Sequence, residues 1–232
     1  MTLIWTVMMI KDNLFEVRRR IEAVCAKLGK NPDLITIVGV SKNRTVEQLK
    51  ELAESGIADV GENKVQEALL KYNQLLTFKL HMVGHLQTNK VKEAVKIFDL
   101  IHSVDSLHLA AEIDKQACRI NKIQDILIEV NTSQEAAKFG FKPDEVIGAV
   151  KQIAVLGNVD IKGLMTVAPV VGNPEQARPF FKLLRELSGQ ISTLHVTPYT
   201  LNILSMGMTD DFEIAIEEGS NMVRLGRVLF DG

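Results

Sequence analysis

The sequence predicts an α/β protein whose eight parallel strands close into a single (β/α)8 barrel, the TIM-barrel architecture, preceded by an N-terminal helix. Short apolar runs and helical patterns alternate along the 232 residues with little connecting chain. Several of the apolar runs, such as residues 126–130, are almost continuous, which is typical of parallel strands covered on both faces. A doubly wound open sheet is the competing architecture, but eight parallel strands in a chain of this length favour closure.

The first helix is expected over residues 13–28, where Leu14, Val17 and Ile21 recur at helical spacing until Gly29 ends the pattern. Strands are predicted near residues 35–41, 58–61, 79–84, 100–104, 125–131, 159–167, 200–206 and 221–226. Helical patterns fill residues 45–55, 64–76, 89–97, 107–121, 144–155, 174–188 and 210–218. Because no linker, low-complexity tract or charge run interrupts this alternation, residues 1–232 are predicted to form one domain.

Composition excludes several classes of function. Hydrophobic residues make up 46% of the chain, enough for a large core, and the net charge of −2 supplies no basic field for nucleic acid. Cys25 and Cys118 are far apart without metal-ligand spacing, so buried thiols of a reducing compartment are expected. The first ten residues are apolar but too few to span a bilayer, and they lack the features of a signal peptide. We therefore expect a cytoplasmic protein with no nucleic-acid or membrane partner.

The most informative residue is Lys42, which directly follows the β-branched run 35–41. Thr45 and Gln48 come next at capping-box spacing, so a helix is expected to start there. A lysine fixed at the carboxyl end of a strand can lose hydration, fall in pKa and form an imine with an aldehyde. A solvated lysine at the start of a loop is the simpler interpretation of any one such residue, and the rest of the chain decides between the two.

Polar residues recur at the carboxyl ends of the other predicted strands, where barrel enzymes carry their chemistry. In chain order, the strand ends contain Lys42, Asn63, His85, Ser103, Asn131, Thr166, Ser205 and Arg224. Each alone is an ordinary turn or cap residue, but their shared location predicts a polar ligand site. Ser205 and Gly207 after the seventh strand, and Gly226 after the eighth, allow a phosphate to approach the backbone. Together with the amine of Lys42, they indicate a phosphorylated aldehyde as the ligand.

Eight segments along nearly the whole chain carry a resemblance to a known family. They are VGVSK (38–42), GENKVQEAL (61–69), HMVGHLQTNK (81–90), HSVDS (102–106), VNTSQEAAKFG (130–140), GLMTVAP (163–169), LSMGMTDDFEIAIEEGS (204–220) and VRLG (223–226). In these segments the chain resembles the YggS/PROSC-type pyridoxal phosphate homeostasis proteins. The resemblance implies the barrel of the alanine racemase N-terminal domain (fold type III), pyridoxal 5'-phosphate (PLP) as cofactor, and a role in vitamin B6 homeostasis.

The resemblance also implies roles for individual residues. Lys42 is expected to hold PLP as a reversible aldimine, Asn63 to lie beside the cofactor, and Arg224 to face the pyridine nitrogen. Ser205, Gly226 and nearby backbone groups are expected to hold the phosphate. The full set of expected cofactor-binding residues is Lys42, Asn63, His85, Met165, Ser205, Met206, Gly207, Arg224, Gly226 and Arg227. No catalytic or metal-binding residue is assigned.

For some residues a purely structural role is equally open. His85 at the rim is explained equally well as a hydrogen-bonded structural residue, and Met206 as a side chain that fills a gap in the core. His81, His102 and His108 are expected to be structural or solvated.

Two positions depart from the family pattern. Family members usually carry Ser or Thr where this chain has Arg227, and a guanidinium offers phosphate a charge in a different geometry. The proline that usually follows the lysine is absent, with Thr45 near its place. We expect neither change to abolish binding.

The expected site suits a cofactor carrier better than an enzyme. An arginine at the pyridine nitrogen disfavours protonation of that nitrogen, so the ring stabilises carbanions less well. Racemases with this barrel recruit a tyrosine base from an added β-domain. That domain is not expected here, because the sequence ends just after the eighth strand. Neither Tyr72 nor Tyr199 is expected to be placed as the base. We therefore predict a non-catalytic protein, a monomer or weak homodimer, that hands PLP to apo-PLP enzymes.

Two other functions stay open. One is a PLP-dependent amino-acid racemase or decarboxylase with a minimal site, of which residual racemase-like activity would be the mildest form. The other is a barrel enzyme acting on sugar phosphates, with Lys42 as its Schiff-base lysine. Turnover of amino acids would indicate the first, and failure to retain PLP would indicate the second.

Overall fold

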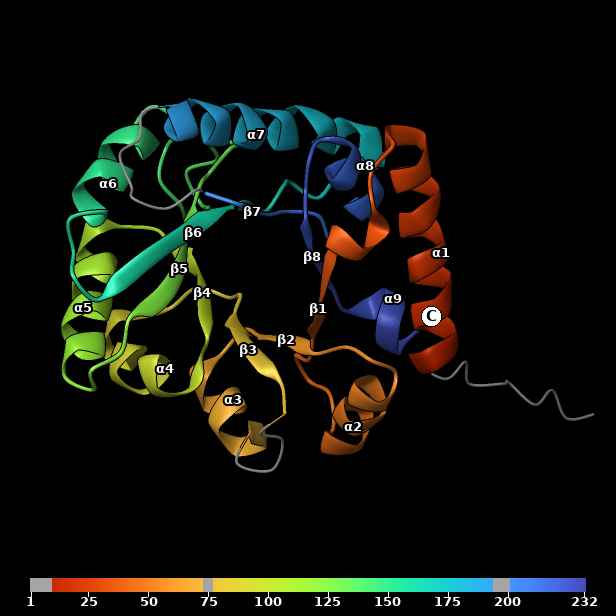
Figure 1. Ribbon diagram of the computed structural model, residues 1–232, viewed down its shortest axis with the longest axis horizontal. Helices are drawn as coiled ribbons and strands as arrows, with labels where there is room; N and C mark the ends of the chain where they lie inside the picture. Colours follow the sequence, from red (N-terminus) through yellow and green to blue (C-terminus); the bar gives the residue numbers. More distant parts are fainter. Residues whose placement is uncertain (1–9, 73–76, 194–200) are drawn as a thin grey trace, which may run out of the picture.

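The computed structural model describes residues 10–72, 77–193 and 201–232, which form a closed barrel of eight parallel strands (Figure 1). The strands follow chain order around the barrel and β8 pairs with β1, so the predicted (β/α)8 closure is confirmed. They are β1 (Thr36–Val40), β2 (Asp59–Glu62), β3 (Lys79–Met82), β4 (Leu100–Val104), β5 (Gln124–Glu129), β6 (Val159–Met165), β7 (Ile203–Ser205) and β8 (Met222–Leu225). Parallel pairing brings all the carboxyl ends to one rim.

Helices surround the barrel on its outer side (Figure 1). They are α1 (Ile10–Leu28), α2 (Val46–Glu54), α3 (Val65–Tyr72), α4 (Val91–Ile97), α5 (Leu107–Cys118), α6 (Val146–Ile153), α7 (Arg178–Thr193), α8 (Phe212–Glu217) and α9 (Arg227–Phe230). The first helix, α1, packs against α8 and α9, so the two ends of the described chain meet. Asn13 of α1 donates a hydrogen bond to the Leu229 carbonyl at 3.1 Å, which ties these ends together.

Several element boundaries differ from the predicted ones. Helix α1 begins at Ile10, three residues before the predicted start, because Ile10 extends the buried stripe of the helix. Pro174 starts a separate 3-10 helix, and α7 continues to Thr193 instead of ending at 188. The short helix α9 is an element that the sequence did not predict. The apolar N-terminus (1–9), the end of the third predicted helix (73–76) and the start of the seventh predicted strand (200) lie outside the described residues.

The core has two parts. Most buried apolar side chains lie between the strands and the helices. A smaller cluster fills the inside of the barrel and consists of Val38, Leu100, Leu127, Met165 and Met222. Because side chains alternate along a strand, His102, Glu129 and Arg224, each two positions beyond a member of this cluster, also point inward, nearer the carboxyl rim. The interior therefore becomes polar toward that rim.

In the described part of the chain, no helix is both long and apolar enough to cross a membrane. The His, Cys, Asp and Glu side chains of the same residues form no group of three that could hold a metal ion. Cys25 is buried in α1, as expected, whereas Cys118 is exposed at the end of α5. The prediction that both thiols are buried is thus wrong for Cys118, because this residue does not belong to the buried apolar face of α5 and is exposed to solvent.

Candidate functional site

Lys42 lies two residues beyond the end of β1, at the carboxyl rim. Its predecessor Ser41 is held in a buried cluster, because Ser41 Oγ donates to Glu62 Oε1 at 2.6 Å and the Ser41 carbonyl accepts from Lys71 Nζ at 2.8 Å. Lys71 also pairs with Glu62 at 2.6 Å. Lys42 itself is exposed, and its amine has no hydrogen-bond or ion-pair partner among the residues that the structure describes. The backbone beside this amine is therefore fixed while the amine stays accessible.

Asn63 and His85 follow the neighbouring strands at the same rim. The backbone of Gly84 packs so closely on Asn63 that a Cβ atom at position 84 would lie 2.5 Å from the Asn63 carbonyl oxygen. The His85 ring stacks on Phe139, with 3.7 Å between ring centroids, and its Nδ1 lies 3.1 Å from Asp105 Oδ2. His85 is thus tied to the loop after β5, which brings that loop over the rim.

Arg224 points from β8 into the barrel and is only 4% exposed. Its guanidinium donates to Ser205 Oγ at 2.6 Å and to the Thr166 carbonyl at 2.8 Å. Burial lowers the pKa of Arg224 to about 10, although the nearby carboxylates of Glu129 and Asp211 favour its charged form. The guanidinium therefore remains a cation and a donor at neutral pH.

Ser205 and the two methionines lie deeper than expected. The Ser205 hydroxyl is fully buried and bonds to Arg224 and to His102 Nδ1, the latter at 3.0 Å, so it is engaged inside the barrel rather than at the rim. Met165 belongs to the apolar cluster inside the barrel. Met206 is fully buried in the layer between strands and helices, where it fills the core.

The loops after β7 and β8 meet at the rim. Gly207 has φ +94°, and a Cβ there would lie 2.6 Å from the Ala215 Cβ, so both backbone and packing require glycine. After β8, Gly226 precedes the first turn of α9, and the Val228 amide of that turn lies 3.5 Å from Thr209 Oγ1. Arg227 is exposed and pairs with the carboxylate of Asp210.

Thr209 is a residue whose position sequence reasoning missed. The sequence places Thr209 only where the following helix would be capped and not among the cofactor-binding residues, yet its hydroxyl oxygen faces the Val228 amide in the first turn of α9. The available signal was its position two residues after Gly207, in the loop already expected to face a phosphate.

Glu129 is the second missed residue. It ends β5 and points inward with Arg224, and its carboxylate accepts no hydrogen bond within the described chain. Burial, reinforced by the neighbouring Asp105, raises the pKa of Glu129 from 4.5 to about 7, while Arg224 opposes the shift. A carboxyl group poised near neutral pH beside the cation is the best-placed proton acceptor that we find among the described rim residues.

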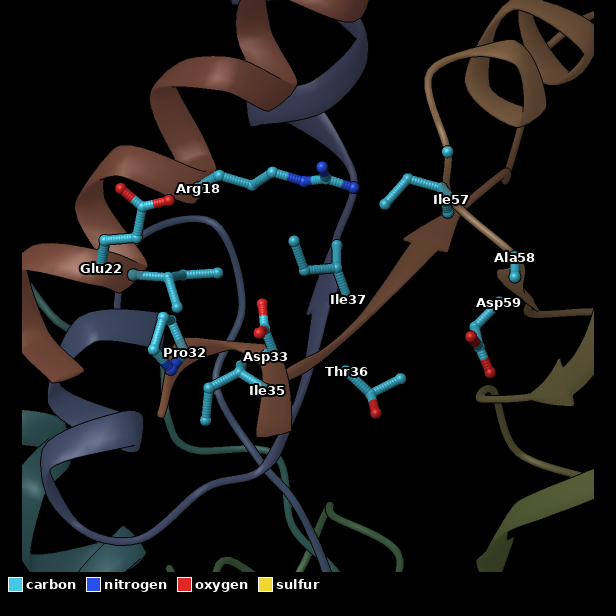
Figure 2. A pocket seen from close by; sticks show the side chains of 12 residues that line it. Arg18, Glu22, Pro32, Asp33, Ile35, Thr36, Ile37, Ile57, Ala58 and Asp59 are labelled. Atoms are coloured by element: carbon cyan, nitrogen blue, oxygen red, sulfur yellow. The ribbon is translucent and has the colours of Figure 1, made fainter. Parts of the chain in front are cut away.

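Cavities lie at both ends of the barrel. At the carboxyl rim, a cavity of about 530 Å³ lies between the loops after β6 and β7, with Pro169 and Thr209 in its wall. Another, of about 360 Å³, lies between α1 and the amino ends of β1 and β2, where Figure 2 shows Arg18, Glu22 and Asp59 around it. The rim cavity borders the loop that follows Gly207, but none of the predicted site residues lines either cavity.

Comparisons with known proteins agree with this architecture. Residues 13–232 match the family model described as alanine racemase, N-terminal domain. The chain is 42% identical to the pyridoxal phosphate homeostasis protein of Aquifex aeolicus over 221 residues, 94% of this chain and 96% of that protein. Two solved structures are also similar. One is an unknown protein from Bifidobacterium adolescentis, with a TM-score of 0.90 and 30% identity over 95% of this chain and 94% of that chain. The other is PipY of Synechococcus elongatus PCC7942 with PLP bound, with a TM-score of 0.79 and 30% identity over 91% of this chain and 99% of that chain.

The barrel and the arrangement of its rim define a protein of the class built on the alanine racemase N-terminal domain. Within that class, the chain belongs to the pyridoxal phosphate homeostasis protein family.

Proposed function

We propose that this protein binds PLP reversibly through Lys42 and serves to hold and deliver the cofactor. The observation that carries the proposal is the Lys42 amine, which has no partner within the described part of the chain, on the same barrel rim as the inward-pointing Arg224 cation. Support comes from the family, whose members are named for PLP homeostasis, and from PipY, a 30% identical relative solved with PLP bound. When bound, PLP supplies an aldehyde that condenses with a primary amine and a ring that can accept electrons.

The residues present fit each part of that cofactor. Lys42 offers the amine, and Arg224 offers a buried donor suited to a ring nitrogen that carries no proton. For a dianionic phosphate, the Thr209 hydroxyl supplies a donor, since its oxygen accepts from the Val228 amide while its proton stays available. Gly226 leaves room there, because a Cβ at this position would have its nearest neighbour, Val40, at 3.7 Å. We assign Ser205 to the support of Arg224 instead of to the phosphate, since its hydroxyl is engaged in the interior.

The remaining expected residues take supporting roles in this proposal. Asn63 and His85 line the mouth, and Gly207 shapes the loop that leads to Thr209. Met165 forms part of the apolar floor beneath the site. Arg227 adds positive charge near the phosphate, although its exposed pairing with Asp210 limits that contribution.

We infer that delivery of PLP, and not turnover, is the main activity. Arg224 stays cationic and so disfavours a protonated ring nitrogen, which weakens the ring as an electron sink. The exposed Lys42 amine is accessible to an acceptor, for which apo-PLP enzymes are the proposed partners. We further propose that residues 1–232 act as one PLP-binding domain in the cytoplasm, as a monomer or a weak homodimer.

One observation favours a second function, a slow PLP-dependent racemase or decarboxylase. Glu129 has a pKa near neutral and lies within electrostatic reach of Arg224, which is where a proton acceptor would be useful. No second base is identified beside it: Tyr199 lies outside the described residues, and the structure describes only the backbone of Tyr72, in α3.

The test begins with purified protein and PLP. We expect a new visible absorption band and, after borohydride reduction, a mass adduct on the peptide containing Lys42. Lys42→Ala should lose both, whereas Lys64→Ala, which removes another exposed rim lysine, should keep both. An unchanged adduct yield in Lys42→Ala would refute the proposal, and no binding by the native protein would direct attention to sugar phosphates.

Turnover is tested separately with the loaded protein. Incubation with alanine and other amino acids, followed by chiral analysis, should show no racemisation beyond that of free PLP, and mixing with an apo-PLP enzyme should restore that enzyme's activity. Amino-acid turnover that Glu129→Gln abolishes would instead establish the second function.

A further inference from the structure

A continuous line of side-chain hydrogen bonds crosses the inside of the barrel. It runs from Arg224 to Ser205 Oγ (2.6 Å), from Ser205 Oγ to His102 Nδ1 (3.0 Å), from His102 Nε2 to His81 Nδ1 (2.9 Å), and from His81 Nε2 to Asp59 Oδ1 (3.0 Å). These residues come from β8, β7, β4, β3 and β2. The four residues other than Asp59 are at most 4% exposed. Neighbours on the line are mostly far apart in sequence, so only barrel closure brings them together.

Donor and acceptor counting gives this line a single direction. Arg224 can only donate, so Ser205 must accept from it, and the hydroxyl proton of Ser205 is then available for His102 Nδ1. With Nδ1 accepting, the single proton of a neutral His102 is on Nε2 and is donated to His81 Nδ1. The proton of His81 is likewise on Nε2 and is donated to Asp59.

The opposite direction leaves partners unsatisfied. If His102 Nδ1 carried the proton, Ser205 would accept two hydrogen bonds and its own proton would face neither partner. A neutral His81 would then turn the lone pair of Nε2 toward the Asp59 carboxylate, oxygen against nitrogen with no proton between them. A buried hydroxyl without a partner is destabilising, so this direction is disfavoured.

The charge state of His102 agrees with this direction. Burial is the largest cause that lowers the pKa of His102 well below its ordinary value, and His81 and Arg224 act in the same sense. His102 is therefore neutral and carries one N–H group, as the counting requires. The line begins at a guanidinium and ends at a carboxylate, so its bond dipoles all point the same way between opposite charges.

We propose that Ser205, His102, His81 and Asp59 form a positioning relay that fixes the orientation of the Arg224 guanidinium toward the ring nitrogen of bound PLP. This inference rests on the proposed function. The residues act through Arg224 and not on the cofactor, so they are positioning residues and not catalytic ones. The relay ends at Asp59, which lines the cavity of Figure 2 at the far end of the barrel and is reached from there without crossing the PLP site.

The first test needs no PLP. Long-range ¹H–¹⁵N NMR of protein labelled in histidine reports which ring nitrogen carries the proton. We expect Nδ1 of His102 and of His81 to accept and Nε2 of each ring to carry the donated proton, and Asp59→Asn to alter the His81 signals most. A proton on Nδ1 of His102 would overturn the relay, whatever the protein does with PLP.

The second test uses two variants of one residue. In His102→Asn, the side-chain carbonyl of the asparagine lies near the position of Nδ1 and can accept the hydrogen bond from Ser205. In His102→Gln, the longer amide side chain reaches the position of Nε2 and keeps only the contact with His81. We expect His102→Gln to release PLP about tenfold faster, the loss of roughly one buried hydrogen bond, and to shift the absorption band of bound PLP. His102→Asn should restore most of both, and His108→Gln, an exposed histidine on α5, is the matched control.

The outcomes separate the two levels of the proposal. Equal effects of His102→Asn and His102→Gln on the band and on the release rate, in variants with native circular dichroism, would overturn the positioning role. If the native protein fails to bind PLP at all, the proposed function falls, while the NMR result still decides whether the directed line exists.

Discussion

Glu129 provides the sharpest prediction about stability. The pKa of its carboxyl rises from 4.5 to about 7 on folding, chiefly through burial, so the folded protein binds more protons than the unfolded chain between these pH values. The free energy of unfolding must therefore fall as the pH rises from about 4.5 to above 7. One pKa unit corresponds to about 1.36 kcal/mol, so a shift of 2.5 units costs about 3 kcal/mol at pH 8.

The perturbation is Glu129→Gln, which keeps the shape of the side chain and removes its charge. Urea unfolding of PLP-free protein at pH 5 and at pH 8 gives the free energy of unfolding of the native chain and of the variant. We expect the variant to be about 3 kcal/mol more stable than the native chain at pH 8, and the two to differ by less than about 1 kcal/mol at pH 5. The difference between the two pH slopes isolates Glu129 from the other titrating groups.

Glu186→Gln on the exposed surface of α7 serves as the control and should leave the pH slope unchanged. Parallel pH dependences of native protein and Glu129→Gln would show that the carboxyl is solvated in solution and that the argument from burial is wrong. A variant less stable at pH 8 would show that attraction to Arg224 outweighs desolvation.

Three further predictions, one with a control substitution, concern the packing and the charge around the site. Gly84→Ala should lower the free energy of unfolding by about 1–3 kcal/mol in urea and weaken PLP binding, because the added Cβ would displace Asn63. Gly148→Ala in α6 is the control and should stabilise the protein by roughly 0.5–1 kcal/mol, because nothing lies within 4 Å of the added Cβ. Equal effects of the two substitutions would contradict this reasoning. Leu127→Ala, inside the barrel, should lower the free energy of unfolding by roughly 2–5 kcal/mol, and a loss below 1 kcal/mol would mean that the interior cluster relaxes. Arg227→Ser should change that free energy by less than about 0.5 kcal/mol, since its ion pair is exposed, and PLP titration should show binding retained; a complete loss of binding would make Arg227 essential.

The sequence predicted the barrel and the positions of its rim residues because both follow from local patterns. Apolar runs marked the strands, and the polar residue after each run had to lie at the carboxyl rim once the strands were parallel. The capping box at Thr45 is present as predicted, since it depends on residues three apart. The placement of Lys42 and Arg224 is therefore information that the sequence carries on its own.

What the sequence could not supply are contacts that depend on barrel closure. His81 and His102 are 21 residues apart, and His102 and Ser205 are 103 apart, so no local pattern joins them. Glu129 was hidden for a different reason: it ends an apolar run, and only the alternation of β5 seen in three dimensions shows that it points inward. The burial of Met206 between strands and helices likewise follows from the alternation of side chains along a strand, and a one-residue error in assigning that alternation moves a side chain to the other face.

The polar upper interior of the barrel is a cost that the fold itself does not require. Burial lowers the pKa of Arg224 and raises that of Glu129, so each charge is destabilised where it lies, and well-packed apolar residues are often as stabilising as such buried charges. The lower interior shows that this barrel can be filled by apolar side chains, since Leu100, Leu127 and Met222 do so. Charges kept at the rim end, with hydrogen bonds ordered toward one cation, are what a ligand-binding interior needs, because a pre-oriented donor loses little freedom when the ligand arrives. The stability lost to Glu129 and Arg224 is therefore best explained by binding, and the directed line of hydrogen bonds is what keeps the cation ready for it.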